Sequence, residues 1–110
     1  MSIKKIESKE ELQQVQGETE RFFLLKNSIT CPVSREALEE MEKYSDSDSA
    51  LPVYYLNVQE LREVSNGIAD EYGIKHESPQ VFLIQKNDVV WDASHWKVTK
   101  KNAERAAEAL

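Results

Sequence analysis

The stretch RFFLLKNSITCPVSREALEEMEKY, residues 21–44, constrains the fold most, because it surrounds the only cysteine of the chain with a strand and a helix. Its first part, 21–26, contains the continuous apolar run FFLL, which is typical of a strand buried on both faces. Pro32 directly follows Cys31, and proline is favoured at the first position of a helix. We therefore predict a strand over 21–26 and a helix over 32–44, with Cys31 at the helix N-cap.

Cys31 is the candidate catalytic residue. At a helix start, the unpaired N–H groups of the first turn and the positive end of the helix dipole both favour a thiolate. The thiolate is the nucleophilic form of cysteine. An isolated cysteine is by default a small buried side chain without reactivity, so the strand–Cys–Pro–helix order is the feature that predicts a reactive one.

Length and charge bound the class of protein. A chain of 110 residues fits one domain, 1–110, whose core needs no disulfide or metal. The net charge of −6 argues against a surface for nucleic acid or anionic membranes. No apolar run reaches the length of a membrane span, the N-terminus lacks the apolar core of a signal peptide, and one cysteine forms no internal disulfide. We expect a cytoplasmic protein with no nucleic-acid or membrane partner.

The rest of the chain predicts an alternation of helices and strands. A capping box at Ser8 and Glu11 opens a short helix that Gly17 ends. Apolar periodicity predicts, in chain order, a strand over 51–58, a helix over 59–72, a strand over 80–85, a strand over 89–92 that pairs back as a hairpin, and a helix from the cap Thr99 to Leu110. The order α-β-α-β-α-β-β-α predicts an α/β fold, a four-stranded mixed sheet flanked by helices.

Two motifs add a family resemblance. The string Thr30-Cys31-Pro32-Val33-Ser34, with Ser78-Pro79 before the third strand, resembles the thioredoxin superfamily over nearly the whole chain. In that superfamily the reactive cysteine starts a helix after a strand, and a cis-proline lies opposite it, which Pro79 matches. Cys-Pro-Val-Ser is similar to the glutaredoxin Cys-Pro-x-Cys motif, with serine in place of the second cysteine. The Thr-Cys-Pro-x-Ser string resembles more closely the small monothiol bacilliredoxins of the YtxJ type.

The resemblance implies a thiol–disulfide oxidoreductase that works with one thiol. Ser34 cannot attack a mixed disulfide, so the resolving step of dithiol thioredoxins is missing. In the implied mechanism, Cys31 removes bacillithiol from an S-bacillithiolated client protein and keeps it until a small thiol or a partner reductase frees it. Bacillithiol, a low-molecular-weight thiol that replaces glutathione in many Firmicutes, is the implied co-substrate. No tightly bound cofactor and no metal are implied, and we expect a monomer.

The resemblance also implies binding residues around the sulfur. If the Ser78-Pro79 bond is cis, the backbone of Ser78 faces the cysteine and can pair with an extended substrate. Lys26 occupies roughly the place of a glutaredoxin lysine that binds a thiol's carboxylate, and bacillithiol carries malate carboxylates. The hydroxyl of Ser34 either satisfies a backbone donor or bonds to the sulfur. The candidate thiol- and substrate-binding residues are Lys26, Thr30, Pro32, Val33, Ser34, Ser78 and Pro79.

Four aromatic or imidazole side chains carry weaker expectations. His76 and His95 with one cysteine do not supply the four ligands of a zinc site. His76, three residues before the candidate cis-proline, is expected either as a surface histidine or near the active face. Trp91 and Trp96 are expected to pack in the core or at a sheet edge.

Two other functions remain open from the sequence. Some monothiol glutaredoxins carry an iron–sulfur cluster, usually with a Cys-Gly-Phe-Ser motif, and here Pro32-Val33 replaces the Gly-Phe pair. A thioredoxin-like interaction module with an unreactive Cys31 is the third hypothesis, which burial of the sulfur would support.

Overall fold

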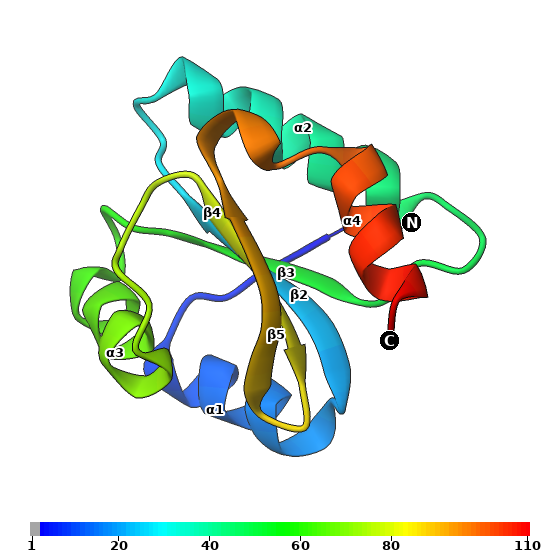
Figure 1. Ribbon diagram of the computed structural model, residues 1–110. Helices are drawn as coiled ribbons and strands as arrows, with labels where there is room; N and C mark the ends of the chain where they lie inside the picture. Colours follow the sequence, from blue (N-terminus) through cyan, green and yellow to red (C-terminus); the bar gives the residue numbers. More distant parts are fainter. Residues whose placement is uncertain (1–2) are drawn as a thin grey trace.

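A computed structural model describes residues 3–110 and shows one mixed sheet between two layers of helices (Figure 1). Helices α2 and α4 cover one face of the sheet, and α1 and α3 cover the other. The elements are β1 (Lys4–Lys5), α1 (Lys9–Glu18), β2 (Arg21–Asn27), α2 (Pro32–Ser45), β3 (Val53–Asn57), α3 (Arg62–Tyr72), β4 (Gln80–Gln85), β5 (Asp88–Ser94), the short 3-10 helix η1 (His95–Lys97) and α4 (Lys100–Glu108).

The sheet has five strands in the order β1-β3-β2-β4-β5, where four were expected. The additional strand, β1, contributes two residues that pair in parallel with Tyr54 and Tyr55 at the sheet edge. A strand of two residues shows no alternation of apolar and polar side chains, so the sequence pattern does not reveal it. The predicted α/β class, the parallel β2–β3 pair and the antiparallel β4–β5 hairpin are confirmed.

Several predicted boundaries shift by a few residues. Gly17 lies inside α1, which ends one residue later, so this glycine is not its terminator. The helix predicted over 59–72 starts at Arg62 instead of residue 59, because 58–60 form a turn after β3. The hairpin turns on Lys86 and Asn87, both with positive φ, as two-residue hairpin turns require. Thr99 caps α4 through the N–H of Asn102, as predicted.

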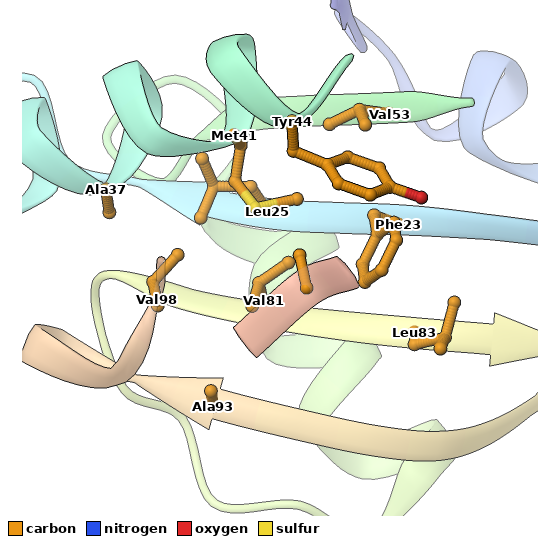
Figure 2. Packing of buried hydrophobic residues seen from close by; sticks show 11 residues of the cluster. Phe23, Leu25, Ala37, Met41, Tyr44, Val53, Val81, Leu83, Ala93 and Val98 are labelled. Carbon is orange, nitrogen blue, oxygen red and sulfur yellow. The ribbon is translucent and has the colours of Figure 1, made fainter. Parts of the chain in front are cut away.

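The apolar run of β2 supplies both halves of the core. Its side chains alternate between the two faces, so Phe23 and Leu25 pack under α2 and α4, and Phe22 and Leu24 pack toward α1 and α3. Figure 2 shows the first half, in which the rings of Phe23 and Tyr44 meet edge to face with centroids 4.9 Å apart. The four apolar side chains of the β2 run, residues 22–25, are all fully buried. Truncating either phenylalanine to alanine is expected to cost about 3–5 kcal/mol of stability.

The topology gathers three loops at one edge of the sheet. Since β2 and β3 are parallel, the loops that follow them leave the same edge, and antiparallel β4 starts there. Lys26 pairs with Leu56 on one side and with Gln80 on the other, which fixes this register. The loop before α2, the loop after β3 and the Ser78-Pro79 loop therefore lie together (Figure 1).

Candidate active site

Cys31 is the N-cap of α2, as predicted. Its backbone is extended, with φ −111° and ψ 123°, and Pro32 occupies the start of the helix. The carbonyl of Cys31 accepts the first helical hydrogen bond from the N–H of Arg35 at 3.1 Å. The cysteine is partly exposed and forms no disulfide. A sulfur at this position is open to a disulfide that arrives from solvent.

The pKa of the Cys31 thiol lies below its ordinary value of 9.0. The largest cause is the backbone N–H of Ser34, and the N–H of Val33 and the Ser34 hydroxyl act in the same direction, while partial desolvation of the sulfur opposes them. The Cys31 side chain closes no capping hydrogen bond, so these groups act as dipoles near the sulfur. Their sum favours the thiolate, the form that attacks a disulfide.

Ser34 is fully buried, and its Oγ has no hydrogen-bond partner. It therefore satisfies no backbone donor, which was one of its two expected roles. Its contribution to the lowered pKa of Cys31 favours the other role, a hydroxyl beside the sulfur, although no closed hydrogen bond joins the two. Serine at this position cannot resolve a mixed disulfide, because it carries no thiol.

The loop before Cys31 is fastened to the segment after β3. The amide of Gln59 donates to Ser28 Oγ at 2.7 Å and to Thr30 Oγ1 at 3.5 Å, and its carbonyl oxygen accepts from the N–H of Ile29 at 3.2 Å. Thr30 is exposed and precedes the cysteine directly, and its bond to Gln59 also helps to anchor the loop. Gln59 was not among the residues predicted from the sequence. The signal for it is a polar side chain two residues after β3, a strand whose end lies beside the end of β2.

The Ser78-Pro79 peptide bond is cis. The carbonyl of Pro79 accepts a hydrogen bond from the N–H of His95 at 2.9 Å, which ties this loop to the end of β5. Within residues 3–110, the backbone N–H and carbonyl of Ser78 form no hydrogen bond. Gln80 holds the preceding residues by accepting from the N–H of Glu77 and donating to the carbonyl of Lys75. The loop thus presents unpaired backbone groups on a fixed support.

Lys26 does not reach the surface around the cysteine. It is fully buried, and its Nζ donates to the carbonyl of Ser65 at 2.9 Å and lies 3.2 Å from His76 Nδ1. Nζ also lies 5.7 Å from the ring centroid of Phe82. Burial lowers the pKa of Lys26 from 10.5 to about 8. A buried ammonium that already has two partners is poorly placed to bind the carboxylate of a thiol.

His76 is not a plain surface histidine, which was one of its two expected roles. It is partly buried and turns toward the interior, where its Nδ1 meets Lys26 and, at 3.4 Å, Ser65 Oγ. Burial, and then the charges of Lys26 and Arg62, hold the pKa of His76 below 6.5. A neutral imidazole can accept a hydrogen bond at Nδ1 from the Lys26 ammonium, and this pairing holds the loop before Pro79 from inside.

Two hollows flank the start of α2. One, of about 590 Å³, is lined by the loop before Cys31 and the outer side of α2, with Arg35 as its basic side chain. The other, of about 300 Å³, lies between α2 and the segment after β5, and Val33 and Trp96 both line it. Trp96 is 70% exposed, so its predicted packing in the core or at a sheet edge is wrong. Trp91 packs edge to face against Phe23, as predicted.

Comparison with known proteins fits this geometry. The sequence model of the family described as "Monothiol bacilliredoxin BrxC" matches residues 4–103. The chain belongs to the monothiol bacilliredoxin family. One solved structure, a protein of thioredoxin fold proposed to be an oxidoreductase, is 33% identical to the bacilliredoxin over 96% of this chain and 93% of that one, with a TM-score of 0.90.

Two thioredoxins show how far the fold alone extends. A poplar thioredoxin h mutant is 17% identical, with 98% of this chain and 81% of that one covered and a TM-score of 0.82. A mutant thioredoxin from Halobacterium salinarum NRC-1 is 15% identical, with 98% and 89% covered and a TM-score of 0.78. The bacilliredoxin thus has the thioredoxin fold, and its family indicates thiol–disulfide redox function. Among residues 3–110, no helix has the length and apolar character that crossing a bilayer demands.

Proposed function

We propose that this bacilliredoxin removes bacillithiol from S-bacillithiolated client proteins by one-thiol exchange at Cys31. The observation that carries the proposal is a partly exposed cysteine with a lowered thiol pKa at the start of α2, with serine where dithiol relatives carry a second cysteine. The family match supports the choice of small thiol.

The first step is a disulfide exchange. The Cys31 thiolate attacks the bacillithiol sulfur of the client mixed disulfide, a new S–S bond forms, and the client sulfur leaves with the electron pair of the broken bond. The client thiolate takes a proton from solvent, and Cys31 now carries bacillithiol. No net oxidation occurs, because one disulfide replaces another.

The second step needs an outside thiol, since Ser34 carries no sulfur. A second bacillithiol thiolate attacks the bacillithiol sulfur held on Cys31, which yields oxidised bacillithiol and frees the Cys31 thiolate. A partner reductase with a thiol of its own can serve in place of the small thiol.

The Ser78-Pro79 loop is the proposed docking edge for the client. The unpaired N–H and carbonyl of Ser78 can add an extended client segment by backbone hydrogen bonds. The exchange needs the client disulfide above Cys31, and this loop starts β4 at the same edge of the sheet. Lys26 has no part in the proposed binding, because its ammonium is buried. Arg35 is a solvent-exposed cation beside the cysteine that can meet a malate carboxylate instead.

The experiment that tests the proposal follows the masses of both partners. Reduced protein is mixed with a peptide that carries a bacillithiol mixed disulfide, and intact masses are recorded over time. We expect the peptide to lose one bacillithiol and the protein to gain one, while a Cys31→Ala variant gains none. Absence of transfer to the wild-type protein would overturn the proposal, and a cluster spectrum after anaerobic reconstitution would favour the iron–sulfur alternative.

A further inference from the structure

Trp96 is the most exposed large apolar side chain among residues 3–110, and the exchange proposed above does not use it. It lies in η1, the turn that follows β5 and packs beside the first half of α2 (Figure 1). Two hydrogen bonds hold this turn, from the N–H of His95 to the carbonyl of Pro79 and from the N–H of Val98 to the carbonyl of His95. The backbone that carries the indole is therefore held beside the Ser78-Pro79 loop.

Trp96 lines the hollow of about 300 Å³, which has features of a small-molecule binding site. Val33, two residues after Cys31, and Trp96 contribute apolar walls, and Glu36, Glu39 and Glu40 contribute carboxylates. Glu40 already accepts hydrogen bonds from the N–H of Lys100 and from Lys43 Nζ, which leaves Glu36 and Glu39 as the available acceptors. Ligand pockets combine apolar and aromatic walls with a few placed polar groups, and this hollow has that composition. Its volume lies at the lower end of the range for small-molecule sites, which suits one ring.

The wall chemistry matches a sugar ring. A pyranose has an apolar C–H face that can lie on an aromatic ring, and a rim of hydroxyls that donate hydrogen bonds to carboxylates. An apolar client side chain placed in the same hollow would strip water from Glu36 and Glu39 and return no hydrogen bond. The carboxylates thus favour a polyol over an apolar peptide segment.

We infer that Trp96 is a stacking platform for the sugar ring of the small thiol held on Cys31, and that Glu36 and Glu39 accept hydrogen bonds from its hydroxyls. The inference rests on the proposed function, because bacillithiol carries a glucosamine ring between its cysteinyl and malyl parts. Trp96 then acts as a specificity-determining residue, which selects a glycosidic thiol over a thiol without a sugar.

The test compares two leaving groups on one peptide. The same peptide is prepared with bacillithiol or with plain cysteine as its disulfide partner, and second-order transfer rate constants to the protein are measured for each. Trp96→Ala is expected to slow bacillithiol transfer on the order of fivefold, the scale of one aromatic contact, and to leave cysteine transfer unchanged. Trp96→Phe, which keeps an aromatic face, should recover part of the loss.

The matched control is Val90→Ala, which trims an exposed apolar residue near the hairpin turn, at the other end of β5 from η1. It should change neither rate. Equal slowing of both peptides by Trp96→Ala would assign the indole to the client and overturn the inference, as would no slowing at all. Failure of the proposed function is distinct, because the wild-type protein would then transfer bacillithiol no faster than the Cys31→Ala variant.

Discussion

Cys31 and Lys26 lie on one short segment, and both have a lowered pKa, yet the causes are opposite. For the cysteine, backbone N–H groups at a helix start favour the charged form. For the lysine, burial disfavours the charged form. The comparison teaches that a lowered pKa has no fixed functional meaning. It marks an activated group at the exposed start of α2 and an electrostatically unfavourable one beneath the sheet surface.

The lysine is unusual because it is fully buried without an acidic partner. No carboxylate within residues 3–110 lies at ion-pair distance from its Nζ, and its contacts are a backbone carbonyl, an imidazole and an aromatic face. A buried charge normally destabilises a protein unless it is paired. The contact with His76 ties this lysine to the loop before Pro79 from inside. Client binding at that loop, as proposed above, would need the loop held in place.

The largest effect is expected from removing the sulfur alone. Cys31→Ser keeps the size of the side chain and should reduce bacillithiol transfer at least 1,000-fold, on the order of the loss seen when a nucleophile is deleted. The free energy of unfolding should stay equal or rise by up to about 1 kcal/mol, because serine is a good N-cap and Cys31 closes no capping bond. Transfer rates and urea unfolding check both outcomes.

A Cys31→Ser variant that unfolds more easily would contradict this separation. It would mean that the sulfur contributes to the stability of α2 and that reactivity and structure are not independent at this position. Cys31→Ala serves as the control for capping, since alanine is a poor N-cap and should lower stability relative to serine.

The lysine should reveal itself as a rise in stability at alkaline pH. Folded Lys26 loses its proton near pH 8, while in the unfolded chain it keeps the proton up to 10.5. Between these values the unfolded state binds more protons, so the free energy of unfolding rises with pH, by about 3 kcal/mol in total. Urea unfolding from pH 7 to 10.5 measures this slope.

Lys26→Met is the matched variant, because methionine fills similar space without a charge. It should be more stable than the wild type at pH 7 by about 1–3 kcal/mol and should lose the alkaline slope. Transfer to a protein client should slow while alkylation of Cys31 by iodoacetamide stays the same, since the variant loosens the docking loop and leaves the α2 N-terminus intact. If the free energies of unfolding of the two proteins changed in parallel with pH, burial would not lower the pKa of Lys26.

The sequence indicated the Cys31 end of the molecule better than the Lys26 side, for a physical reason. Proline after cysteine fixes a helix start by local geometry, and the N-cap position and its effect on the sulfur follow from that alone. The environment of Lys26 depends on which face of β2 it points from. Alternation along the strand places it with Phe22 and Leu24 toward α3, whereas the glutaredoxin resemblance implies a lysine that faces the thiol.

Other features depend on contacts that no local pattern carries. Trp96 is expected in the core or at a sheet edge, but in η1 it is exposed. The bond from the His95 N–H to the Pro79 carbonyl that holds η1 is a tertiary contact that no local pattern predicts. Gln59 reaches the Cys31 loop across 29 to 31 residues of sequence. Pairing of β1 with β3 is likewise a tertiary contact of two residues.

The smallest expected effect tests the balance of dipoles at Cys31. Ser34→Ala removes the weakest of the three favourable groups and keeps both backbone N–H groups. The pKa of the thiol should therefore rise only slightly, with alkylation at pH 7 slowed on the order of twofold. Stability should hold or increase by up to about 1 kcal/mol, because the variant deletes a buried hydroxyl that has no hydrogen-bond partner. The pH profile of iodoacetamide alkylation, with urea unfolding alongside, measures both. A large rise in the thiol pKa would show that the hydroxyl, and not the helix start, is the main support of the thiolate, which would reverse the order of causes argued for this sulfur.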